Sequence, residues 1–183
     1  MEALSARINS LPVSATLAMA AKARELKNEG IDVIGLSLGE PDFNTPEFIK
    51  DAAIQAVNDN YNSYSPVDGY ADLKQAIITK FKRDNGLDYA ANQIVVSTGA
   101  KQSIANVCIV LLNPGDEVLL PAPYWVSYSA IATLAEAKST IIPTSIDKDF
   151  KITPEQLEAV ISPKTKLIMF NSPNNPSGTI YTE

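Results

Sequence analysis

Apolar and polar positions alternate along the first half of the chain with a helical period. Small apolar residues recur between Ser14 and Gly30 with polar side chains between them, which predicts a helix with a serine N-cap and a glycine at its end. A second helix is predicted to about residue 58, with Thr45 as N-cap and Pro46 as first helical residue. A third is predicted over about residues 70–84, ended by Gly86. Its apolar face consists of Leu73, Ala76, Ile77 and Phe81.

Short runs rich in β-branched residues predict strands, and helical segments separate the later ones. The predicted strands are residues 31–38, 94–96, 117–120, 140–142 and 166–170. The predicted helices between them are residues 101–112, 126–137 and 153–161. The last begins with a capping box, Thr153 to Gln156, and has proline in its first turn. This alternation is typical of an α/β fold, and a sheet that ended with residues 171–178 would be unfinished.

Composition narrows the class of protein. The chain has 183 residues, 45% of them hydrophobic and 20% charged, which is typical of a globular domain. Its net charge of −6 leaves no basic face, so we expect small-molecule partners and no nucleic acid. No apolar run approaches the roughly 20 residues that cross a bilayer, and no signal pattern opens the chain. We therefore expect no membrane partner and a cytoplasmic location.

The absence of histidine limits the chemistry further. A chain without histidine has no Ser-His or Cys-His pair and no histidine metal site, so we expect no metal. Cys108 is the sole cysteine and lies in an apolar run, where core packing is the better interpretation than a reactive thiol.

Three segments follow or precede predicted strands in a way that suits a ligand. Residues 95–102 place small residues between a strand and a helix, where free backbone N–H groups attract an anion. Trp125 follows the strand at 117–120 and offers a flat ring at the sheet edge. Residues 172–178 follow the last strand and offer amide side chains held by prolines. Taken singly, residues 95–102 are better explained by a plain strand-to-helix turn and Trp125 by loop packing. A Pro/Asn turn explains the composition of residues 172–178 but not their place at the same sheet edge.

Together the motifs resemble the class I, fold-type I aminotransferases, and most of all bacterial aspartate aminotransferases, some of which accept prephenate. The matching segments are residues 37–43, 64–66, 97–102, 121–125 and 171–178. The resemblance implies the first part of the large domain that binds pyridoxal 5'-phosphate, with a mainly parallel sheet and flanking helices. It also implies a division into residues 1–45, an N-terminal arm and small-domain segment, and residues 46–183, an incomplete large domain.

The resemblance assigns the cofactor contacts. It implies that the backbone amides of Gly99, Ala100 and Lys101 hold the cofactor phosphate and that Trp125 lies against the pyridine ring. Asn175 would donate to the phenolic oxygen of that ring. It further implies cis peptide bonds before Pro123 and Pro176.

Substrate and partner contacts follow from the same resemblance. Gly39 would offer its N–H to the substrate, with Trp125 and Asn175 at the same site, and the substrates would be an amino acid and a 2-oxo acid. Tyr64 would reach the cofactor phosphate of a neighbouring subunit, which implies a homodimer.

Departures from the family leave alternatives open. Family members are longer, and their Schiff-base lysine is expected to lie beyond Glu183, so no catalytic residue is assigned in this chain. Pro12 stands where prephenate-accepting members carry a basic residue, which speaks against prephenate. Beside an aminotransferase, the sequence admits a β-lyase or cyclopropane-carboxylate synthase relative, or a non-catalytic half-length ligand-binding protein.

Overall fold

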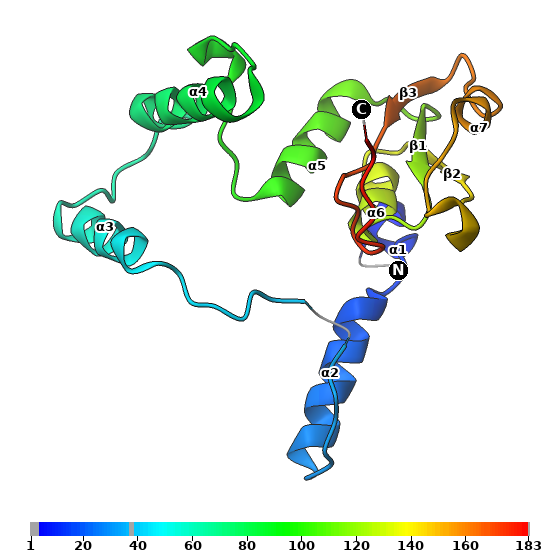
Figure 1. Ribbon diagram of the computed structural model, residues 1–183, viewed down its shortest axis with the longest axis horizontal. Coiled ribbons are helices and arrows are strands. Elements are labelled where there is room, and N and C mark those ends of the chain that lie inside the picture. The colour runs from blue at the N-terminus through cyan, green and yellow to red at the C-terminus, as the bar shows by residue number, and fades with distance from the viewer. Residues whose placement is uncertain (1–3, 37–38, 183) are drawn as a thin grey trace. The chain divides into compact units, whose positions relative to one another are not determined.

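The computed structural model describes residues 4–36 and 39–182 (Figure 1). The chain separates into two compact units. The helical unit is Val13–Val95, and the sheet unit is Met1–Pro12 together with Val96–Glu183. The sequence resemblance assigns residues 1–45 and 46–183 to two different domains of the family, and this assignment stays a prediction.

The helical unit contains the three helices that the pattern predicts. They are α2 (Ala15–Asn28), α3 (Glu47–Asn58) and α4 (Ala71–Asn85), followed by the short 3-10 turn η1 (Ala91–Gln93). Ser14 caps α2 by accepting a hydrogen bond from the Leu17 N–H at 3.4 Å. Pro46 is the N-cap of α3 rather than its first helical residue. Gly86 ends α4 with φ 69°, a left-handed conformation that glycine adopts without strain.

Two predicted strands are wrong. Residues 31–36 and 94–96 belong to no strand, and residues 37 and 38 of the first run lie outside the described part of the chain. A β-branched run becomes a strand only when another strand bonds its N–H and C=O groups, and neither run has such a neighbour among the described residues.

The helical unit buries few apolar side chains. Ala20 and Ile94 are buried, whereas Leu73, on the predicted apolar face of α4, is 44% exposed. Lys74 is buried too, and its ammonium donates to the carboxylate of Asp68. That hydrogen bond lowers the pKa of Asp68.

The sheet unit contains a three-stranded parallel sheet in the order β2-β1-β3. The strands are β1 (Glu117–Pro121), β2 (Lys138–Ile142) and β3 (Thr165–Ile168), which confirms the other three predicted strands and the α/β class. Val118, Leu119 and Leu120 are almost completely buried, as expected for a central parallel strand covered on both faces. The register pairs Glu117 with Lys138 on one side and, with an irregularity after Glu117, with Thr165 on the other.

Helices surround this sheet. They are α1 (Ala6–Asn9), α5 (Ala100–Leu111), α6 (Ser127–Leu134) and α7 (Pro154–Glu158), with the 3-10 turn η2 (Ile146–Lys148). In Figure 1, α6 lies beside β1 and β2, and its buried residues join Val118, Leu120 and Cys108 in one hydrophobic core. Cys108 is fully buried, and burial raises the pKa of its thiol, which confirms its interpretation as a packing residue.

Two predicted helices end earlier than expected. α6 stops at Leu134 and α7 at Glu158, whereas the sequence predicted residues 137 and 161. The capping box of α7 is confirmed: Thr153 Oγ1 accepts from the Gln156 N–H, and Gln156 Oε1 accepts from the Thr153 N–H. None of the described helices is long and apolar enough to cross a membrane.

Candidate functional site

The carboxyl ends of β1 and β3 bring two of the predicted ligand segments to one edge of the sheet. The strands are parallel neighbours, so their C-terminal ends lie on the same side. Residues 122–125 follow β1, and residues 171–178 follow β3 shortly after its end. In open α/β sheets this edge is where ligands bind.

The start of α5 supplies free backbone donors. Gly99 is its N-cap, and Ala100 and Lys101 are its first two residues, so the helix begins one residue before the predicted start at residue 101. Among the described residues, no acceptor bonds the N–H groups of Ala100 and Lys101, because first-turn amides have no intrahelical partner. The Gly99 N–H, in contrast, donates to the Ser97 carbonyl at 2.8 Å. The described helix start therefore offers two free amides of the three predicted.

Trp125 is half-buried between two side chains of the sheet unit. Tyr128, in the first turn of α6, meets the indole edge to face, with ring centroids 5.6 Å apart and planes at 85°. The Lys101 Nζ lies 5.1 Å from the centroid of the same indole. Burial raises the pKa of the Tyr128 hydroxyl, which keeps that group neutral to higher pH. The structure thus brings together two of the predicted cofactor residues, Lys101 and Trp125.

The loop after β3 is tied together by its own hydrogen bonds. Asn174 N donates to the Thr179 carbonyl at 2.8 Å, and Gly178 N donates to the Asn174 carbonyl at 2.8 Å. Asn174 Oδ1 also accepts from the Ser177 N–H at 3.1 Å. Asn175 itself is exposed, and its side chain makes no hydrogen bond among the described residues. Its amide is therefore free to donate to a ligand.

Both predicted cis peptide bonds are confirmed. They precede Pro123 and Pro176, and a third, before Pro173, was not predicted.

Sequence reasoning missed the residue that holds the base of this loop. The Tyr181 N–H donates to Ser172 Oγ at 3.0 Å, and the Tyr181 hydroxyl accepts from the Ile152 N–H at 3.0 Å. The Tyr181 ring also packs edge to face against Phe170, with the ring centroids 5.6 Å apart. Spacing gives no signal for these contacts, because Ile152 lies far away in the sequence.

Gly39 and Tyr64 belong to the helical unit. Gly39 has no heavy atom within 4 Å of where a Cβ would stand, and the Tyr64 side chain is fully exposed. Their assigned roles stay predictions.

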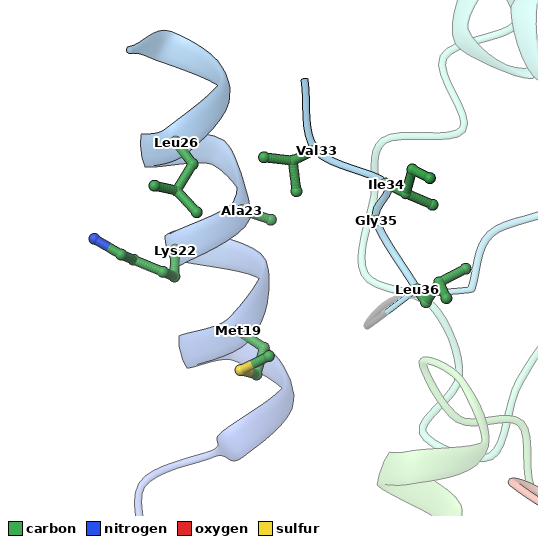
Figure 2. Close-up of a pocket in the computed structure, with 8 residues that line it drawn as sticks. All are labelled: Met19, Lys22, Ala23, Leu26, Val33, Ile34, Gly35 and Leu36. Carbon is green, nitrogen blue, oxygen red and sulfur yellow. The ribbon is translucent and has the colours of Figure 1, made fainter. Parts of the chain in front are cut away.

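The remaining features of the described residues offer no comparable site. They contain no group of His, Cys, Asp or Glu that could hold a metal ion. Figure 2 shows an apolar groove of about 360 Å³ between α2 and residues 33–36. Val33 points toward Leu26 and Ala23 of α2, Met19 lies farther along the helix, and Lys22 is the one charged side chain among the described lining residues. Without converging polar groups, this groove has little to orient a small polar ligand.

Comparison with known proteins gives a consistent set of relatives. Residues 31–183 match the family described as Aminotransferase class I and II. The chain is 52% identical over 179 residues to an aspartate/prephenate aminotransferase of Nitrosomonas europaea, covering 98% of this chain and 45% of the relative. It is 51% identical over 181 residues to an aspartate aminotransferase of a Bacillus species, covering 99% of this chain and 46% of the relative.

Solved structures agree with this result. The aspartate aminotransferase of Rhizobium meliloti superimposes with a TM-score of 0.93 at 46% identity, covering 98% of this chain and 45% of that one. The Thermus thermophilus aspartate aminotransferase with maleate gives a TM-score of 0.96 at 40% identity, covering 100% and 48%. The chain therefore spans about half the length of the curated relatives it matches.

Proposed function

Because the chain belongs to the aminotransferase class I and II family, we propose that it forms the phosphate-binding and ring-binding part of a pyridoxal 5'-phosphate site. The full-length protein would transfer the amino group of L-aspartate to a 2-oxo acid. Aspartate is proposed because both relatives described above are named for it. The observation that carries the proposal is the pair of unbonded N–H groups of Ala100 and Lys101 at the start of α5, the helix whose Lys101 ammonium lies 5.1 Å from the centroid of the Trp125 indole.

The start of α5 fits a phosphate group. Two free amides and the positive end of the helix dipole attract a dianion without needing a charged side chain. The Gly99 N–H can join them once it releases the Ser97 carbonyl. All three predicted amides thus keep their proposed role, with Gly99 as the one that must rearrange.

Trp125 and Asn175 fit the rest of the cofactor. The indole supplies a flat surface for a pyridine ring, and the exposed Asn175 amide can donate to an oxygen of that ring or of a substrate carboxylate. Gly39 is proposed to offer its N–H to the same substrate. Tyr64 is proposed to reach the cofactor phosphate of a second copy, which makes the functional form a homodimer.

When bound, pyridoxal phosphate supplies the electron sink that makes removal of the α-proton of an amino acid possible. The residues of this chain bind and orient it: Ala100 and Lys101 hold the phosphate, Trp125 covers the ring, and Asn175 fixes its edge. The base that moves the proton is assigned to no residue of this chain. A cytoplasmic location is also proposed.

Pyridoxamine 5'-phosphate tests the proposal, because its amine cannot form an imine with surface lysines. Trp125 is the sole tryptophan, so quenching of protein fluorescence reports binding beside this ring. We expect saturable quenching, and we expect inorganic phosphate to compete with it. Pyridoxamine, which lacks the phosphate, should bind at least about 10-fold more weakly, since one hydrogen bond to a charged group contributes about 1.5–3 kcal/mol.

Two variants sharpen this test. Asn175→Ala should weaken binding of pyridoxamine phosphate and leave binding of inorganic phosphate unchanged, because its amide is proposed to meet the ring. Asn106→Ala, an exposed asparagine later in α5, is the matched control and should change neither. The proposal fails if pyridoxamine phosphate and pyridoxamine quench Trp125 equally, or if neither quenches it at millimolar concentration.

A further inference from the structure

The indole of Trp125 is contacted from two helices of the sheet unit. Tyr128 of α6 meets it edge to face at 5.6 Å, and the ammonium of Lys101, from the first turn of α5, lies 5.1 Å from the ring centroid. A cation within about 6 Å of an indole centroid is attracted by the negative face of the ring, and indole is the strongest partner of this kind. The contact therefore links the start of α5 to the loop after β1.

Lys101 stands where a cation is otherwise disfavoured. The N-terminus of a helix carries positive partial charge, so a lysine in the first turn of α5 gains nothing from the helix dipole. It also makes no ion pair within the described part of the chain, whereas Lys138 pairs with Glu117 and Lys151 with Asp149. The attraction that the structure gives this ammonium is the indole face of Trp125.

We propose that Lys101 is a positioning residue whose ammonium, held over Trp125, fixes the orientation in which the indole meets a flat ligand. The inference rests on the proposed function for its consequence, because the ligand is the pyridine ring assigned to Trp125. It adds a side-chain role to a residue whose backbone N–H alone was assigned. With Tyr128 on one side and Lys101 on another, the indole is oriented before the ligand arrives, which lowers the entropy that binding must remove.

The pairing itself is tested without ligand. Acrylamide quenching and the emission maximum of Trp125 are measured in the parent chain, Lys101→Met, Lys101→Arg and Lys164→Met. Lys164 is the matched control, because it is exposed and makes no ion pair among the described residues. We expect Lys101→Met to raise the acrylamide quenching constant about 2-fold, while Lys101→Arg and Lys164→Met match the parent. An unchanged constant in Lys101→Met, or an equal rise in Lys101→Arg, overturns the proposal.

The consequence for binding is tested by a double-mutant cycle with Trp125→Leu, following the emission of pyridoxamine phosphate itself. We expect Lys101→Met to weaken binding about 2- to 5-fold in the parent chain, which corresponds to a cation–π contact of about 0.5–1 kcal/mol, and to have no further effect beside Trp125→Leu. Lys101→Arg should restore parent affinity.

Other outcomes of the cycle are also decisive. Equal losses in both backgrounds, with a matching loss of inorganic phosphate binding, would show that Lys101 acts on the phosphate by charge alone and would overturn the inference. Tighter binding in Lys101→Met would show that the ammonium blocks the ring, which overturns it too. If the parent chain does not bind pyridoxamine phosphate, the proposed function fails, and the ligand-free measurement still decides whether Lys101 positions Trp125.

Discussion

Replacing Gly99 by alanine tests the backbone geometry on which the proposed phosphate site depends. Gly99 has φ 84° and ψ 161°, a region that residues with a Cβ avoid at a cost of about 1–3 kcal/mol. A Cβ built at Gly99 meets no heavy atom within 4 Å, so no steric clash adds to this cost. We therefore expect Gly99→Ala to lower the free energy of unfolding by about 1–3 kcal/mol, wholly through the backbone.

The same substitution should weaken phosphate binding. If the alanine introduced by Gly99→Ala relaxes to negative φ, the peptide group that carries the Ala100 N–H turns, and one of two free donors leaves the site. A hydrogen bond to a charged group contributes about 1.5–3 kcal/mol, so we expect affinity for pyridoxamine phosphate to fall about 10- to 100-fold.

Urea unfolding at fixed protein concentration, followed by circular dichroism, measures the first effect, and Trp125 quenching measures the second. Gly35→Ala is the control, because Gly35 also has open space around its Cβ position and has no positive φ. It should change stability little or raise it by about 0.4–1 kcal/mol. Parent-like stability and affinity in Gly99→Ala would refute both steps, and a loss of stability with unchanged affinity would refute the phosphate site alone.

Three further predictions concern the core, pH and association. Leu120→Ala removes a fully buried side chain of β1 and should cost about 2–5 kcal/mol in urea unfolding, whereas Leu111→Ala, 52% exposed, should cost clearly less. Burial raises the pKa of the Tyr128 hydroxyl, so the neutral hydroxyl's contribution to stability should be fully present below its ordinary pKa of 10.0. That contribution should be lost as pH rises through the pKa of Tyr128 in the folded protein. Urea unfolding midpoints measured from about pH 8 to 11 should therefore fall less steeply in Tyr128→Phe than in the parent chain. Ile109 and Val110 of α5 are 68% and 81% exposed, so sedimentation over a dilution series should show a dimer or larger species, and a monomer at every concentration would contradict this.

The sequence predicts those elements whose signals are local. Ser14, Gly86 and the Thr153 capping box each mark a helix end by hydrogen bonds or φ values that nearby residues determine, and the structure confirms all three. Strands depend on partners. The run at 117–120 is a strand because β2 and β3 bond it on both sides, whereas the β-branched run at 94–96 has no described partner. Both runs are mainly apolar, so composition could not separate them.

The candidate site divides in the same way. The helix start just after Gly99 follows from small residues before a helical segment, and the sequence predicts it to within one residue. The hydrogen bond from the Gly99 N–H to the Ser97 carbonyl depends on the φ and ψ values of the turn, which the sequence does not predict. The contact of Lys101 with Trp125 depends on how α5 packs against α6, which motif spacing does not encode.

The loop after β3 and the start of α5 would contribute to the proposed ligand site by opposite means. In the loop, Asn174 accepts hydrogen bonds from the backbone N–H groups of Ser177 and Gly178. These bonds fix the backbone and leave the side chain of Asn175 free to donate. At α5 the backbone itself is left to donate, because Ala100 and Lys101 are too early in the helix to bond within it. Both arrangements leave few donors, and all of them stand on backbone held by other hydrogen bonds. Donors of this kind need little reorganisation when an anion or a ring oxygen arrives, so a small number of them can give useful affinity.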